Sequence, residues 1–482
     1  MSKPPPAAAA EPESRPVRPI RKLRINERAG GDSRPHSLSG QPSLMTRALR
    51  YLLLRVIAVA LLGVCVPFAA AVAASLPLQA PADSVVALGP VPAANDSTEV
   101  PAHDSQPVIV SPDSLPALRA ATRGVDYMWV LRDALMTPAS IDSVVERAAR
   151  MHVKGLLVQV VGRGDAWYAS RLLPRAEPLD SRSDADPLAH MVQRAHASGL
   201  EVHAWMNCLL VWSGKRYPRD YRHVVRAHPD WIAELQDGRR TSWVTARGLK
   251  KLNLEGAYLA PARPGVRCFV ASIAAEIATN YAVDGIHLDY IRQPDAETGF
   301  DPDTRARFAL FHGADPQRFN LAPPARRDSL MRLWRQFQHD QVTAVVRAVR
   351  DTLQSIRPGI SLSAAVVSDP ARSEGSTAQN WRGWLRDGLL DRAYVMCYSP
   401  EVQTVMDQLL SIGQELGASQ RVVPGIAVYN TSPVTAAVKL RGARALGYPL
   451  LALYSYDSLF ALDRGWKRLE QGLVSQPSAA EH

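Results

Sequence analysis

The chain has 482 residues, of which 46% are hydrophobic, so it can form one large globular domain with appended segments. The formal net charge is +10, but residues 1–55 hold 11 Lys and Arg against 4 Asp and Glu, which is +7 of that excess. Because the rest of the chain carries only +3, a nucleic-acid partner is not expected.

The N-terminal quarter of the sequence contains no pattern typical of a folded domain. Residues 1–44 are rich in Pro, Ala and Arg, which predicts a disordered basic extension; the segment from Met45 would then be the natural start. Residues 45–75 combine arginines, an apolar run and small residues, so they fit either a cleaved signal peptide or a membrane anchor. Residues 76–122 form a Pro- and Ala-rich linker. We expect an exported, periplasmic or cell-envelope protein that contacts a membrane only through an uncleaved N-terminal segment.

Residues 123–472 alternate regularly between apolar strand-like runs and amphipathic helical runs, followed by a tail at 473–482. The predicted strands are 125–131, 155–162, 200–207, 284–291, 360–367, 392–399, 421–429 and 449–456. The predicted helices are 137–153, 186–199, 265–281, 330–356, 380–388, 401–417, 434–447 and 462–473. Strands that are apolar on both faces are typical of a buried parallel sheet. Eight such units predict an α/β fold of the (β/α)₈ TIM-barrel type.

An open doubly wound sheet is the alternative fold, but it would need a Gly-rich phosphate loop after an early strand, and the sequence has none. Two connections are unusually long, from 208 to about 263 and from 292 to about 328. Both follow strands, so in a barrel both lie at the C-terminal face, where active sites are built.

Polar and aromatic side chains mark the C-terminal ends of the predicted strands, where a barrel would bring them together. His203, Trp205 and Asn207 alternate along one strand and therefore share one face. His287 and Asp289 do the same on the next strand. The other strand ends supply Arg163, Asp165, Tyr398, Tyr429 and Tyr454.

Asp289 is the residue with the strongest functional signal. A carboxylate at the end of a buried strand is costly unless it is paired or used in chemistry. The alternative is a structural ion pair with Arg163 or Arg292. The aromatic residues of the 208–263 connection either stack on sugar rings or form a small core of that loop; these are Trp212, Tyr217, Tyr221, Trp231 and Trp243.

Several long motifs resemble glycosyl-hydrolase-like family 10, a bacterial family of exported barrels. They are "VQVVGRGDAWYAS" (158–170), "EVHAWMN" (201–207), "HPDW" (228–231), "DGIHLDYIRQP" (284–294) and "NWRGWLRDGLLDRAYVMCYSP" (380–400). The resemblance covers residues 123 to 470. It implies a TIM barrel, a cell-envelope location and glycoside hydrolysis, with some members similar to enzymes that act on peptidoglycan strands. The family positions carried over are Arg163, Asp165, His203, Trp205, Asn207, His287, Asp289, Tyr290 and Arg292. Gln293 departs from the family, which usually has Tyr there.

The predicted activity is therefore hydrolysis of a glycan, with peptidoglycan strands or another amino-sugar polymer as the substrate. Glycoside hydrolysis generally uses two carboxyl groups. By analogy with amylase-like barrels, Asp289 is predicted to be the nucleophile or the electrostatic stabiliser. Of the acids near other strand ends, Asp165 and Glu401 are the candidates for the second carboxyl group, ahead of Asp369 and Asp457.

Two other functions are alternatives to hydrolysis by carboxylates alone. A non-catalytic glycan-binding barrel would use Asp289 only as a hydrogen-bond acceptor. A metal hydrolase would need H-x-H or H-E-x-x-H spacings, which are absent, and the cysteines show no paired spacing. We therefore expect no metal and no cofactor.

Overall fold

The computed structural model describes residues 124–474, apart from 182–185, 215 and 295–296. The predicted extension, the export segment and the linker lie outside the described residues. Helix α15 (Gly465–Val474) runs two residues into the predicted tail. Among the described helices, none is both long enough and apolar enough to cross a lipid bilayer.

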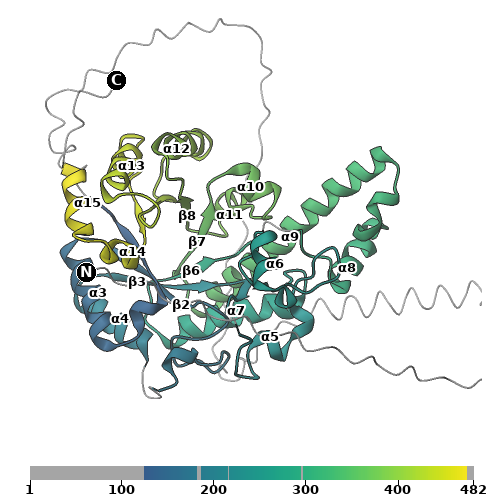
Figure 1. Cartoon of the computed structure of the whole chain (residues 1–482), viewed down its shortest axis with the longest axis horizontal. Helices are drawn as coiled ribbons and strands as arrows, with labels where there is room; N and C mark the ends of the chain where they lie inside the picture. The colour runs from purple at the N-terminus through teal and green to yellow at the C-terminus, as the bar shows by residue number, and fades with distance from the viewer. Residues whose placement is uncertain (1–123, 182–185, 215, 295–296, 475–482) are drawn as a thin grey trace, which may run out of the picture. The chain divides into compact units, whose positions relative to one another are not determined.

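The predicted TIM barrel is confirmed. A closed barrel of parallel strands runs in the order β1-β10-β9-β8-β7-β6-β3-β2 (Figure 1). The barrel strands are β1 (Tyr127–Val130), β2 (Gly155–Val161), β3 (Glu201–Asn207), β6 (Gly285–Asp289), β7 (Ser361–Val367), β8 (Arg392–Cys397), β9 (Val422–Ala427) and β10 (Ala452–Tyr454). Each of these strands lies within one of the eight predicted ranges.

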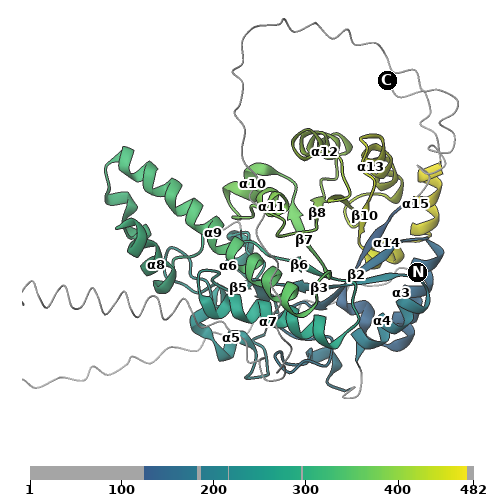
Figure 2. The same cartoon turned by 180° about the vertical axis from the view of Figure 1, so that it is seen from behind.

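An outer ring of helices covers the barrel, as Figure 2 shows from behind. These helices are α3 (Pro138–Arg150), α4 (Pro187–Ala197), α7 (Pro264–Asn280), α9 (Pro324–Ile356), α11 (Trp381–Arg386), α12 (Val402–Leu416), α13 (Pro433–Ala445) and α15. Their boundaries follow from local chemistry. Thr137 precedes Pro138 at the start of α3, and its side chain accepts a hydrogen bond from the Ser140 backbone N–H. At the start of α4, the Asp186 side chain accepts one from the Ala189 backbone N–H.

The two long connections contain the additional elements. The connection after β3 holds a small two-stranded antiparallel sheet of β4 (Leu210–Trp212) and β5 (Ala257–Tyr258), with α5 (Val224–Ala227) and α6 (Ala246–Lys251) between them in the chain. The connection after β6 holds α8 (Pro302–His312) and the 3₁₀ helix η6 (Pro316–Leu321). Shorter helices follow β7 and β10, namely α10 (Pro370–Gly375) and α14 (Tyr456–Ala461).

Helix α9 starts six residues before the predicted range, and its first turns pack with α8 and η6. In Figures 1 and 2 these segments project from the barrel, and we call residues 302–335 the helical arm. Phe308, Phe319 and Trp334 form its small apolar core. These aromatic rings bury one another, with Phe308 and Trp334 in edge contact at 5.1 Å.

The barrel interior is filled mainly with aromatic side chains rather than with the branched aliphatic residues that are common in such barrels. Tyr127, Trp129, Trp205 and Tyr394 belong to one buried cluster. The aliphatic residues of the same strands face outward and pack under the helices. This alternation follows from the two-residue period of a strand, which sends successive side chains to opposite faces.

Candidate active site

The C-terminal mouth of the barrel holds a cavity of about 790 Å³, which we call the mouth cavity. Eight of the predicted site residues line it: Trp205, Asn207, Asp289, Tyr290, Arg292, Tyr398, Tyr429 and Tyr454. They come from β3, β6, β8, β9 and β10 or from the residues directly after these strands. Residues that are far apart in sequence therefore meet here because parallel strands end at the same edge of the barrel.

Asp289 lies in this cavity and is held by N–H donors. The backbone of Tyr290 donates to Oδ1 at 2.7 Å, and the Trp205 indole donates to Oδ2 at 3.1 Å. Tyr290 adopts a left-handed backbone with φ of 47°, which is uncommon for a residue with a side chain. Strain of this kind is typical of functional sites.

The structural ion pair considered for Asp289 is not present among the described contacts. Arg292 instead pairs with Glu255 at 2.7 Å, and Tyr258 donates a hydrogen bond to the same carboxylate at 2.8 Å. Burial raises the pKa of Asp289 to about 6, while the Tyr290 hydrogen bond, the charge of Arg292 and the Trp205 hydrogen bond oppose this rise. Asp289 can therefore hold or release a proton near neutral pH.

Asn207 fixes the position of the Trp205 indole. Its side-chain oxygen accepts a hydrogen bond from that indole at 3.1 Å, and its amide donates to the carbonyl of Gly162 at 2.8 Å. Asn207 and Asp289 are direct partners in the register of β3 with β6. Trp205 thus links two neighbouring strand ends and aims one N–H at the carboxylate.

An aromatic wall borders Asp289. Tyr398 and Tyr454 stack at 5.1 Å, and Tyr429 meets Tyr454 edge-on at 5.9 Å. Tyr429 is 56% exposed, so part of this wall is open to a ligand. Aromatic faces next to polar groups suit sugars, whose rings have apolar C–H faces and hydroxyl edges.

The structure places the other five predicted site residues away from the mouth cavity. His287 is fully buried in the barrel, where it accepts a hydrogen bond from the Trp129 indole at 3.1 Å and bonds Ser363 at 3.0 Å. Burial lowers the pKa of His287 well below the usual range, so the ring stays neutral. His203 shares the inward face of β3 but lies near the N-terminal end of the barrel, bonded to Glu201 at 3.1 Å.

Neither candidate for the second carboxyl group lines the mouth cavity. Asp165 is buried in the connection after β2 and accepts a hydrogen bond from the Arg163 backbone at 3.1 Å; burial raises its pKa. The backbone carbonyl of Arg163 in turn contacts His223 at 2.7 Å. Glu401 is exposed just before α12. The acid that does share the cavity with Asp289 is Asp369, at the end of β7.

Sequence reasoning underestimated Asp369 and missed Arg132. Asp369 is exposed and caps α10 by accepting a hydrogen bond from the Ala371 backbone at 2.9 Å. Arg132 follows β1, lines the cavity and donates to Gln159 at 3.1 Å. An Asp-Pro pair directly after a strand was the available signal for Asp369, since it marks a helix cap at the barrel face.

The aromatic residues of the 208–263 connection pack mainly within that connection. The Trp212 indole donates to the carbonyl of Arg216 at 2.9 Å, and Trp231 stacks on His228 at 3.9 Å. Trp243 lies against the Arg240 guanidinium at 4.8 Å. None of these three lines the mouth cavity. Within the described part of the chain, no group of three or more His, Cys, Asp or Glu side chains is placed to hold a metal ion.

Comparison with known proteins agrees with this barrel. The chain is 25% identical over 294 residues to the glycosyl hydrolase DigH of Escherichia coli strain K12. This alignment covers 56% of this chain and 60% of DigH. The chain is 25% identical over 266 residues to the glycosyl hydrolase YngK of Bacillus subtilis strain 168, covering 52% of this chain and 46% of that protein. The chain thus spans roughly half of these curated relatives.

Solved structures show the same fold at low identity. The glycoside hydrolase domain of PgaB (BpsB) from Bordetella bronchiseptica aligns with a TM-score of 0.54 at 16% identity, covering 73% of this chain and 99% of that one. A GH42 β-galactosidase, Gan42B from G. stearothermophilus, aligns with a TM-score of 0.50 at 11% identity. The alignment covers 73% of this chain and 56% of that one. The sequence model of the family described as glycosyl hydrolase-like 10 matches residues 121–427, more than half of the chain. The chain therefore belongs to the glycosyl hydrolase-like 10 family.

Proposed function

We propose that this protein is a glycoside hydrolase of the bacterial cell envelope, with Asp289 as its key carboxyl group. The observation that carries the proposal is the arrangement at the mouth cavity. A carboxyl group held by two N–H donors faces the same cavity as a second carboxylate, Asp369, beside an aromatic wall. Two carboxyl groups at one cavity are what glycoside hydrolysis requires.

The raised pKa of Asp289 favours a proton-transfer role over the nucleophile or stabiliser expected from the sequence. A carboxyl group with a pKa near 6 keeps a proton over part of the working range and can donate it to the leaving glycosidic oxygen. Asp369 is exposed at the cavity and supplies the second carboxylate. The tyrosine wall then receives the sugar rings, and Arg132 and Gln159 are placed to bind hydroxyl groups.

The substrate we propose is a glycan of the envelope, either peptidoglycan strands or another amino-sugar polymer, reached by an exported protein. The family membership supports glycan hydrolysis in general. The names of the relatives DigH and YngK, both called glycosyl hydrolases, point the same way. Export is supported by the sequence of residues 45–75 alone.

The decisive experiment compares the full-length protein with Asp289→Asn on peptidoglycan glycan strands and on amino-sugar oligomers. We expect the wild type to release shortened products and the variant to release them on the order of 10² to 10⁴ times more slowly. Unfolding curves of both proteins show whether the variant is folded. Equal product release by the two proteins would disprove the role of Asp289. Tight glycan binding without any product from either protein would identify a non-catalytic glycan-binding barrel.

A further inference from the structure

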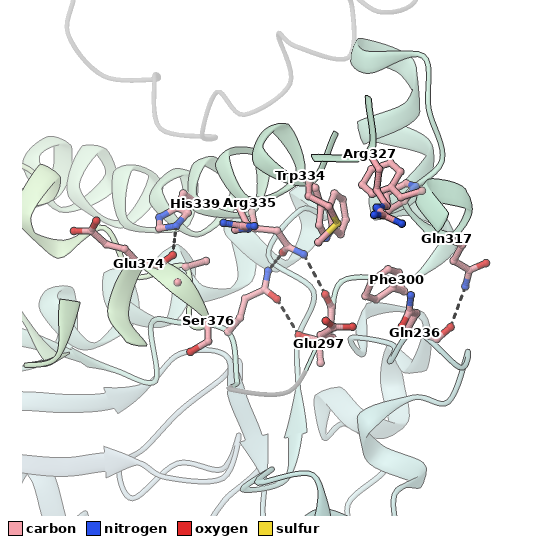
Figure 3. A pocket seen from close by; sticks show the side chains of 18 of the residues that line it. Gln236, Glu297, Phe300, Gln317, Arg327, Trp334, Arg335, His339, Glu374 and Ser376 are labelled. Atoms are coloured by element: carbon pink, nitrogen blue, oxygen red, sulfur yellow. Dashed lines mark hydrogen bonds between the residues drawn. The ribbon is translucent and has the colours of Figure 1, made fainter. Parts of the chain in front are cut away.

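A second cavity of about 460 Å³ lies under the helical arm and is separate from the mouth cavity (Figure 3). One wall is a single face of α9, where Arg327, Trp334 and Arg335 point toward the cavity. The opposite side is formed by the segment around Phe300. We call this space the arm cavity. It contains none of the predicted catalytic residues.

The arm cavity and the mouth cavity share their dividing wall. Arg292 lines the mouth cavity, and the next residue, Gln293, lines the arm cavity. Helix α10 repeats this arrangement, with Asp369 facing the mouth cavity and Glu374 facing the arm cavity. A helix of six residues is about 9 Å long. A polymer that lies across α10 can therefore occupy both cavities.

The floor of the arm cavity is hydrogen-bonded and partly aromatic. The rings of Phe300 and Trp334 lie 5.8 Å apart and are almost fully buried. Beside them, Thr298 donates to the Gln293 side chain at 2.8 Å, and Gln338 donates to the backbone of Thr298 at 3.1 Å. The Gln293 amide also donates to Gln338. A fixed floor of this kind is already organised for a ligand, which lowers the entropy cost of binding.

The arginines on α9 give the cavity its specificity. Arg327 and Arg335 are exposed, and two helical turns, about 12 Å, separate them along one face. Neither guanidinium group makes a hydrogen bond or an ion pair with any described residue. Guanidinium groups have a planar set of donors that matches a carboxylate. Two unpaired guanidinium groups over one cavity therefore favour a ligand with carboxylate groups.

Acidic residues at the same cavity favour an acidic sugar over a simple anion as the ligand. Glu297 and Glu374 also line it, and Glu374 lies 3.8 Å from Arg382. Carboxylates repel a free anion but accept hydrogen bonds from hydroxyl groups. An apolar floor, hydroxyl acceptors and guanidinium donors together match a polyhydroxylated ring that carries a carboxylate.

We propose that the arm cavity binds a carboxylate-bearing sugar residue of the same glycan chain that enters the mouth cavity. The site makes the protein selective for acidic glycans. The continuity of the chain between the two cavities rests on the proposed function, whereas carboxylate recognition by Arg327 and Arg335 does not.

The test measures binding without turnover, by titration calorimetry on the full-length Asp289→Asn protein. The probes are a hyaluronan hexasaccharide, which alternates amino sugars with uronic acids, and the same hexasaccharide with its carboxylates converted to neutral amides. We expect the acidic form to bind roughly tenfold or more tightly than the amide, as expected for hydrogen bonds between charged groups. Adding Arg327→Ala and Arg335→Ala should abolish that difference.

Arg332→Ala provides the matched control, because Arg332 is an exposed arginine on the same helix that does not line the cavity and bonds Ser329 at 3.0 Å. It should keep the full preference for the acidic probe. Equal affinity for the two probes, absence of binding, or an unchanged preference in the double variant would overturn the proposal. The proposed function is judged separately, by whether the wild type releases products from peptidoglycan glycan strands or amino-sugar oligomers faster than Asp289→Asn does. Failure of one test does not decide the other.

Discussion

The two ends of the barrel are built from the same strands and from similar residue types, yet their side chains are arranged for different purposes. At the N-terminal end, Glu201 accepts hydrogen bonds from His203 at 3.1 Å and from Tyr127 at 3.0 Å. At the C-terminal end, Asp289 also accepts two hydrogen bonds but lies in a cavity of about twice the volume, beside an aromatic wall.

The contrast shows that burial and the kind of hydrogen-bond partner, and not the residue type, decide whether the pKa of an acid rises or falls. The His203 hydrogen bond lowers the pKa of Glu201, so that this acid stays ionised. Burial raises the pKa of Asp289 to about 6, so that the protonated and ionised forms of this acid are both populated near pH 6. If the two ends are independent, changes at the mouth should alter activity and changes at the N-terminal end should not.

Among changes that test this contrast, Asp369→Asn at the mouth is expected to have the largest effect on activity. Asparagine caps a helix as well as aspartate does, so α10 should remain folded. Removing the second carboxylate should lower kcat/KM on the order of 10²-fold or more. The control is Glu401→Gln, an exposed acid outside the cavity, which should change kcat/KM by less than about twofold. Equal loss in both variants would refute the assignment of Asp369.

A smaller effect on activity is expected from Trp205→Phe. The change removes the indole N–H that donates to Asp289, which stabilises the ionised carboxylate. Its loss should raise the pKa of Asp289 further and shift the fall in activity at high pH upward by up to about one pH unit. The rate should fall roughly tenfold, the value of one hydrogen bond to a charged group. A pH–rate profile identical to that of the wild type would exclude a role for this donor.

The Asp289 carboxyl group should also lower the free energy of unfolding, by an amount that depends on pH. The pKa of Asp289, about 6, lies above the value of about 3.9 in an unfolded chain, so the folded state loses stability as pH rises from about 4 to 6. Asp289→Asn carries no charge in either state. Its free energy of unfolding, relative to that of the wild type, should rise between pH 4 and pH 6 by about 2–3 kcal/mol in total. Urea unfolding at several pH values measures this, and a margin that shrinks with rising pH would contradict it.

The smallest effect is expected at the N-terminal end, from Glu201→Gln. Here the sign is opposite, because a lowered pKa contributes stability above the ordinary pKa of a glutamate and loses it as the pH falls. About half of Glu201 is exposed, so solvent screening should limit the loss in unfolding free energy to about 1 kcal/mol at neutral pH. kcat/KM should stay within about twofold of wild type. A large loss of activity with unchanged stability would show that the two ends are coupled.

The sequence by itself determined the barrel and the inward faces of its strands. Eight apolar runs separated by amphipathic helices leave few alternatives to a closed parallel barrel. The two-residue period placed His203, Trp205 and Asn207 on one face, and the structure confirms this shared face. Periodicity of this kind is a local property, so it can be read without knowing any contact.

Only the tertiary structure decided which of these side chains reach the mouth. His203 and Asn207 are four residues apart on one strand, which is about 13 Å along it, so they lie at different depths in the barrel. Depth depends on the register between strands, which pairs Asn207 with Asp289 and His203 with Gly285. The paths of the connections after the strands likewise place Asp369, and neither Asp165 nor Glu401, at the mouth cavity. Register and loop path are set by packing between distant segments, and no local pattern records them.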